Sequence, residues 1–357
     1  MTPTFVFLFA FLLPADTLAV GTLRFDVRPL DLGPGEVSLA AADVDRDGRP
    51  DLVAVSSEDG MLRVFRSRGD GRFDAPRGFD AGANPTYVDA ADLNGDGRVD
   101  FVVANHETGY LTTMLAEEDG FRSSRIRIDV DPHPHVVRAF DVDGNGTLDL
   151  VTDDRNRGGL LVLYGTGSGQ FGRSRTLVAT GGDPYLGFHV GDLNGDGKGD
   201  FVTPNPDHTG VTLSRGDGWH EPRRIRTTAP FGVAVADFDG DGVPDLLAAS
   251  GEGASDVEFR AGPGFEGRPE RIPMDRGPKL IAVGDLNGDG IQDATVCTWS
   301  GQLLLVLGGT GGLETHRVSW AGNSWGLLLA DFNGDGRDDV VVADGSSRRG
   351  EIFLSLR

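Results

Sequence analysis

One nine-residue pattern, D-x-[DN]-x-[DN]-G-x-x-D, occurs seven times along this chain of 357 residues. The first copy begins at Asp43 and the last at Asp331, so the mean spacing between copies is 48 residues. A repeat of this length is typical of folds built from copies of one supersecondary unit. The repeat therefore constrains the fold more than any other feature of the sequence.

Between the copies the sequence predicts short β-strands. Each closing Asp is followed by an apolar, β-favouring run, for example residues 52–55 or 340–343. A polar turn, a second apolar run, a Gly-rich turn and further strand-like residues lead to the next copy, and no segment shows a sustained helical period. Four short strands in each repeat indicate an all-β fold, a seven-bladed β-propeller of four-stranded blades.

The two ends of the chain predict how the ring closes. After Asp339 only two strands remain, residues 340–343 and 351–356, where the other repeats have three. Residues 22–32 resemble the missing outer strand. We therefore predict that an N-terminal strand joins the last blade.

An apolar run at residues 5–13 precedes the repeats and is shorter than the ~20 residues that span a bilayer. Small residues follow it at Ala15, Ala19 and Gly21. We interpret residues 1–20 as a signal peptide and 21–357 as one propeller domain, with a buried strand as the alternative for the apolar run. This predicts a secreted, periplasmic or cell-surface protein without a membrane span.

The charge balance limits the partners. The chain has 33 basic and 55 acidic residues and a formal net charge of −22. Such a chain repels phosphates, so we expect no nucleic-acid partner, and we expect a monomer. Cys297 is the only cysteine and lies in an apolar run, which favours a buried structural thiol.

The repeated pattern offers oxygen ligands at positions 1, 3, 5 and 9, and Gly at position 6 permits a sharp turn. Ca²⁺ prefers such an all-oxygen shell, whereas Zn²⁺ and Cu²⁺ prefer His or Cys, which these loops lack. The Glu expected at position 12 of an EF-hand is absent, so position 9 must close the shell. The sequence predicts up to seven Ca²⁺ ions; the alternative is an Asp/Gly turn without metal.

These loops resemble the FG-GAP/VCBS repeats of integrin α-subunit propellers and of many exported microbial proteins. The resemblance covers almost the whole chain after residue 20 and implies a seven-bladed propeller with structural Ca²⁺, but it leaves the partner open. It implies four ligands in every loop, which are Asp43, Asp45, Asp47 and Asp51; Asp92, Asn94, Asp96 and Asp100; Asp141, Asp143, Asn145 and Asp149; Asp192, Asn194, Asp196 and Asp200; Asp237, Asp239, Asp241 and Asp245; Asp285, Asn287, Asp289 and Asp293; and Asp331, Asn333, Asp335 and Asp339.

The opposite face of the ring is predicted to carry the ligand site, because the turns and inter-blade loops of that face hold most histidines and two tryptophans. Three residues before the pattern, most blades have Ala or Leu, whereas blades two to four have polar residues that should lie near the channel mouth. The residues of this predicted ligand face are Asp89, His106, His133, His135, Arg138, Tyr185, His189, His208, Trp299 and Trp325.

The ligand face has several interpretations. His133 and His135 with His106 or His208 would suit a transition-metal or acid–base site, and the alternative is ordinary loop histidines. Tyr87 and Tyr185 with the two tryptophans would suit a glycan or peptide pocket, and the alternative is packing between blades.

The sequence contains no catalytic motif that we recognise, so we expect no enzymatic activity. The leading hypothesis is an exported, calcium-binding propeller that acts as a binding or adhesion module for an extracellular protein or glycan. The alternative is a carbohydrate-active lyase or hydrolase that uses the His-rich face of blades two to four, and a scaffold role comes third.

Overall fold

The computed structural model describes residues 17–128, 134–182, 184, 187–251, 253–275, 277–320 and 322–357. His133 and Tyr185 of the predicted ligand face lie outside these residues, as do residues 1–16 of the predicted signal peptide. The described residues contain one short 3₁₀-helix, η1 (Arg155–Arg157), and otherwise only strands and loops.

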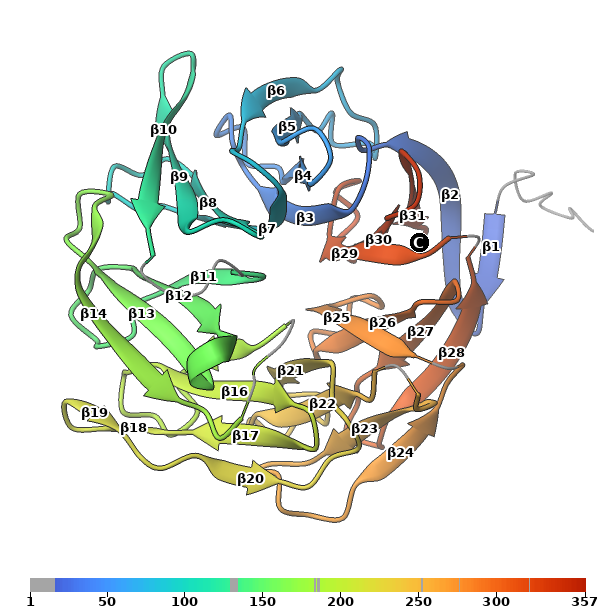
Figure 1. Ribbon diagram of the computed structural model, residues 1–357. Helices are drawn as coiled ribbons and strands as arrows, with labels where there is room; N and C mark the ends of the chain where they lie inside the picture. Colours follow the sequence, from blue (N-terminus) through green and yellow to red (C-terminus); the bar gives the residue numbers. More distant parts are fainter. Residues whose placement is uncertain are drawn as a thin grey trace, which may run out of the picture.

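The strands form seven blades around a common centre (Figure 1), as the sequence predicts. The first three blades are β3 to β6 (Val37–Ala42, Asp51–Ser56, Met61–Phe65, Arg77–Asp80), β7 to β10 (Pro85–Ala91, Asp100–Asn105, Tyr110–Glu117, Gly120–Arg127) and β11 to β14 (Val137–Phe140, Asp149–Asp154, Gly159–Gly165, Phe171–Ala179). The fourth blade is β15, β16, β17 and β20 (His189–Gly191, Asp200–Asn205, His208–Thr212, Arg223–Ile225), with the small hairpin β18 and β19 (Ser214–Arg215, Gly218–Trp219) beside it.

The remaining blades follow the same plan. The fifth is β21 to β24 (Gly232–Ala236, Asp245–Ala249, Asp256–Arg260, Glu270–Pro273), the sixth is β25 to β28 (Pro278–Gly284, Asp293–Thr298, Gln302–Leu307, Glu314–Ser319), and the seventh contains β29 to β31 (Ser324–Ala330, Asp339–Asp344, Arg349–Ser355). Consecutive strands within a blade pair antiparallel, for example Leu39 with Ala54. This pairing is expected for strands joined by short turns.

The N-terminal segment closes the ring as predicted. Strand β2 (Leu23–Asp31) pairs antiparallel with β31, from Phe25 opposite Ser355 to Asp31 opposite Arg349. The seventh blade is therefore built from both ends of the chain (Figure 1). A fifth strand, β1 (Thr17–Val20), pairs with β2 at the outer edge and was not foreseen from the sequence, which places these residues in the signal peptide.

The buried apolar side chains of the described residues form seven clusters, and each lies between two neighbouring blades. The cluster between the sixth and seventh blades contains Phe25 of β2, the fully buried Cys297 of β26, and Phe353 of β31. Cys297 is thus a structural thiol, and burial raises its pKa. Because each blade contributes to two clusters, the ring is held together by packing between blades as well as by strand pairing.

The described residues contain no helix of the length and apolarity required to cross a membrane.

Candidate functional site

The seven acidic loops connect the first and second strands of the seven blades, and neighbouring loops lie side by side. A Cβ atom built on Gly144 of the third loop would lie 2.8 Å from the carbonyl oxygen of Gly197 in the fourth. A Cβ atom built on Gly97 of the second loop would lie 3.6 Å from Nη2 of Arg46 in the first loop. The loops therefore share one face of the ring, the loop face.

The first Asp of each loop is held by the backbone of its own loop. In the second loop, Asp92 accepts hydrogen bonds from the backbone N–H groups of Gly95, Asp96 and Gly97 at 2.8, 3.1 and 2.7 Å. The amides at positions 5 and 6 donate to the position-1 carboxylate in all seven loops. Gly97 itself has φ of 79°, which favours glycine at position 6.

The closing Asp at position 9 ties the loop to the rest of its blade. Asp149 accepts a hydrogen bond from the Val142 amide at 3.0 Å and another from the Gly165 amide at the end of the third strand at 2.8 Å. Every other loop repeats this arrangement. Position 9 therefore has a structural role that the ligand prediction alone did not include.

These closing carboxylates are buried in the blades. Burial raises the pKa of Asp149 to about 6, and that of Asp293 and Asp339 to about 7. Neighbouring loop carboxylates add to the effect, as Asp143 and Asp141 do for Asp149. A nearby cation would reverse this effect, because it favours the ionised carboxylate.

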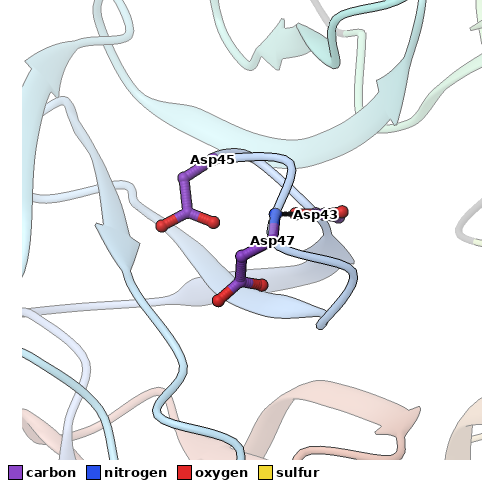
Figure 2. A group of neighbouring side chains, drawn as sticks. All are labelled: Asp43, Asp45 and Asp47. Atoms are coloured by element: carbon purple, nitrogen blue, oxygen red, sulfur yellow. Dashed lines mark hydrogen bonds between the residues drawn. The ribbon is translucent and has the colours of Figure 1, made fainter.

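Three loops bring carboxylate oxygens of three residues within 4.8 Å of one another. These groups are Asp43, Asp45 and Asp47; Asp141, Asp143 and Asp149; and Asp237, Asp239 and Asp245. Figure 2 shows the first group, with its side chains on one tight turn. Carboxylate oxygens so close together repel one another, and they suit a hard divalent cation better than a nitrogen- or sulfur-preferring metal.

In the four loops with Asn at position 3, the amide side chain also belongs to the polar cluster. Asn94 accepts a hydrogen bond from the Asp96 amide at 2.9 Å, and its Nδ2 donates to an Asp96 carboxylate oxygen at 3.2 Å. The donor set of these loops is thus also composed of oxygens, with one neutral oxygen in place of a charged one.

On the opposite face, two of the predicted histidines meet. The His106 and His135 rings lie 4.3 Å apart between their centroids. His135 Nδ1 lies 3.2 Å from Oδ2 of the buried Asp153, whose other oxygen accepts the His135 and Val136 amides. His208 instead contacts Asp207 and Asn205 of its own turn. Asp153 was not foreseen, although the sequence held a signal, because the other six repeats have an uncharged residue four positions after the closing Asp.

The predicted tryptophans enclose a lysine. Nζ of the fully buried Lys279 lies 3.5 Å from the Trp299 ring centroid and 3.3 Å from that of Trp325, and it donates a hydrogen bond to the Ser324 carbonyl at 2.8 Å. The two indoles meet edge to face at 5.1 Å. Burial lowers the pKa of Lys279 to about 7. The sequence held one signal of this site, since Lys279 is one of only two lysines in the chain.

The three polar residues predicted near the channel mouth line a central cavity of about 490 Å³. Asp89, Arg138 and His189 project from the innermost strands of the second, third and fourth blades, β7, β11 and β15. The corresponding residues of the other blades are apolar and line the same cavity; they are Ala40, Ala234, Ala282 and Leu328.

The comparisons with known proteins agree with this architecture. A family model described as FG-GAP-like repeat matches residues 43–103, 92–152, 141–203 and 285–342, more than half of the chain. A crystal structure of BBS1N in complex with ARL6DN, soaked with lead, is similar over 92% of this chain and 94% of that chain, with a TM-score of 0.65 and 10% identity. The mercury-soaked form is similar over the same shares with a TM-score of 0.67 and 11% identity.

At such identities the likeness to these structures concerns the fold alone. Among curated proteins none matches this chain.

Proposed function

This chain belongs to the FG-GAP-like repeat family, and on that basis we propose that it is an exported binding module stabilised by calcium, with an extracellular protein or glycan as its ligand. The observation that carries the proposal is the set of seven similar oxygen-rich loops on one face of a closed ring. The other face is free of these loops and carries chemically varied side chains.

The proposed calcium sites are the seven sets of four residues at positions 1, 3, 5 and 9 of the loops. Calcium would supply positive charge that compensates the repulsion between neighbouring carboxylates, such as those of Asp43, Asp45 and Asp47. It would also keep the buried closing carboxylates ionised. The loops then act as cross-links in a chain whose only cysteine, Cys297, is a buried free thiol.

The proposed ligand face is the one opposite the loop face, with Trp299, Trp325, His106 and His135 on it. The similar BBS1N propeller was crystallised in complex with a protein, ARL6DN, which supports the use of such a ring as a protein-binding surface. The proposed module requires no catalysis. Its proposed state is a monomer outside the cytoplasm.

Calcium binding is tested by removing one carboxylate that has little part in the backbone bonding of its loop. Asp45 fits this purpose, because its carboxylate forms a 3.6 Å ion pair with Arg66, whereas the carboxylates of Asp43 and Asp51 accept hydrogen bonds from backbone amides. We expect the chelated protein to take up to seven Ca²⁺ per chain on reloading, and Asp45→Ala to take about one fewer. Metal content by mass spectrometry after gel filtration provides the measurement.

The matched control is Asp119→Ala, which removes an exposed carboxylate outside the loops and should leave the calcium content unchanged. Free calcium at 100 times the Kd of one site stabilises the folded protein by about 2.7 kcal/mol, so calcium should also raise Tm clearly. If the reloaded protein holds no calcium and its Tm is the same in chelator and in millimolar calcium, the proposal is wrong.

A second candidate function, a carbohydrate-active lyase or hydrolase, is favoured by one observation. His135 contacts the buried Asp153, and its ring lies tilted beside that of His106, an arrangement that can orient an acid–base imidazole. The same metal analysis separates the two functions: calcium alone favours the binding module, whereas a stoichiometric transition metal favours the enzyme.

A further inference from the structure

The central cavity has one polar wall and one apolar wall. Its volume of about 490 Å³ lies within the range of small-molecule sites. Asp89, Arg138 and His189 form the polar wall, and Ala234, Ala282 and Leu328 lie on the blades across the channel. Seven similar blades would be expected to give a uniform channel. The two different walls therefore suit a ligand with one polar end and one apolar end.

Arg138 is positioned as an anion receptor. Its guanidinium carbon lies 4.7 Å from the centroid of the Tyr87 ring, which fixes the plane of the group. The Arg138 Nη1 atom is 3.9 Å from Oδ1 of Asp89, too far for a hydrogen bond. The side chain is 35% exposed although it lies inside the ring, because it faces the cavity. Its planar fork of donors matches a carboxylate.

Asp89 is positioned as the complementary group. Its Oδ2 accepts a hydrogen bond from the Ala139 amide at 2.8 Å, which anchors the carboxylate to the neighbouring blade. Its Oδ1 is the oxygen nearest Arg138. Asp89 and Arg138 thus form a long ion pair without a hydrogen bond, and both side chains line the cavity.

The third polar residue adds no net charge at neutral pH. His189 is partly buried at the cavity wall, and burial together with the nearby Arg138 lowers its pKa to about 4. The polar wall therefore combines one basic and one acidic side chain, Arg138 and Asp89, with a neutral imidazole. A zwitterionic ligand can pair with both members of this ion pair, whereas a ligand with a single charge can pair with only one of them.

We propose that the central channel binds a small zwitterion, an α-amino acid with an apolar side chain. Its carboxylate would pair with Arg138, its ammonium group with Asp89, and its side chain would lie toward Ala234, Ala282 and Leu328. The site uses Asp89, Arg138 and His189 of the predicted ligand face, but binding of a small molecule there requires neither the proposed macromolecular partner nor the calcium loops.

The test compares L-valine with isobutyrate, which has the same carboxylate and branched carbons but no ammonium group, by isothermal titration calorimetry on the calcium-loaded full chain. L-Valine should bind, and Arg138→Gln should weaken its binding about tenfold or more, since it removes a charge-assisted pair. Asp89→Asn should weaken L-valine but leave isobutyrate unchanged. Arg122→Gln, an exposed arginine of β10, serves as the control and should bind normally.

The unliganded Tm of each variant establishes that it is folded. If Arg138→Gln does not fold, Arg138→Lys keeps the charge and loses the planar fork, and it should still bind L-valine more weakly than the wild type. The proposal is overturned if L-valine, L-alanine and L-leucine all fail to bind with a Kd of about 10 mM or lower, which corresponds to a binding free energy of about −2.7 kcal/mol. It is also overturned if the Arg138 variants bind L-valine as tightly as the wild type does.

Discussion

At the scale of single residues, Lys279 carries a pH dependence that can be measured. Burial lowers its pKa to about 7 in the folded protein, against about 10.4 in an unfolded chain, and Cys297 and Glu36 oppose this shift. Between these values the unfolded state binds more protons than the folded state. Stability should therefore rise with pH through this window, at most by about 1.4 kcal/mol per pH unit.

Lys279→Met should abolish this rise, because Met fills a similar volume between Trp299 and Trp325 without titrating. Urea unfolding of both proteins at pH 7.5, 8.5 and 9.5 gives the difference in their unfolding free energies. We expect this difference to shift in favour of the wild type as pH rises. A constant difference would mean that the two indole faces keep the ammonium group charged, contrary to the prediction.

Residue patterns within one repeat could be predicted from the sequence, whereas contacts between blades could not. The acidic positions of the loops recur every 48 residues on average and so indicate their shared role. The pairing of Lys279 with Trp325, or of His106 with His135, depends on which side chains two neighbouring blades bring together. That information lies in the twist and spacing of the ring, which no local pattern encodes.

At the scale of elements, strand β2 closes the ring by pairing with β31 of the last blade. It contributes Leu23 and Phe25 to the core between the sixth and seventh blades, and the Phe25 ring meets that of Phe353 at 6.3 Å. A chain that begins at residue 33 should therefore lose solubility or cooperative unfolding. Phe25→Ala, which keeps the strand, should cost about 3–5 kcal/mol in urea unfolding.

The matched control is a chain that begins at Gly21 and lacks β1. Among the described strands β1 pairs with β2 alone, at the outer edge of the blade, and three of its four residues are not fully buried. The seventh blade would then have four strands like the others, and cleavage of the predicted signal peptide would leave this form. We expect its stability to be close to that of the full chain; a loss as large as that of Phe25→Ala would show that closure requires β1.

Ring closure was predictable because the number of strands in each repeat can be counted. The fifth strand of the seventh blade could not be predicted, because residues 17–20 follow an apolar run and fall within the predicted signal peptide. A strand at the edge of a sheet needs only one partner, so its local sequence carries a weak signal.

At the scale of the whole molecule, the loop face concentrates negative charge. Positions 1, 3, 5 and 9 of the seven loops hold 23 of the 55 acidic residues, and neighbouring loops lie side by side. Seven bound Ca²⁺ ions would change the formal net charge from −22 to −8. The remaining charge is ordinary for a soluble protein, so an acidic glycan is a more acceptable partner for the loaded protein than for the chelated one.

This charge distribution predicts that salt stabilises the two forms differently. Repulsion between loops acts over distances comparable with the Debye length, which falls from ~30 Å at 0.01 M salt to about 8 Å at 0.15 M. Potassium chloride should therefore raise the Tm of the chelated protein, in which each kcal/mol corresponds to about 1 °C for a chain of this length. It should raise that of the calcium-loaded protein much less, because bound ions have already compensated the loop charge. Equal salt dependence of the two forms in thermal unfolding would indicate that the charge of the loop face is not what calcium relieves.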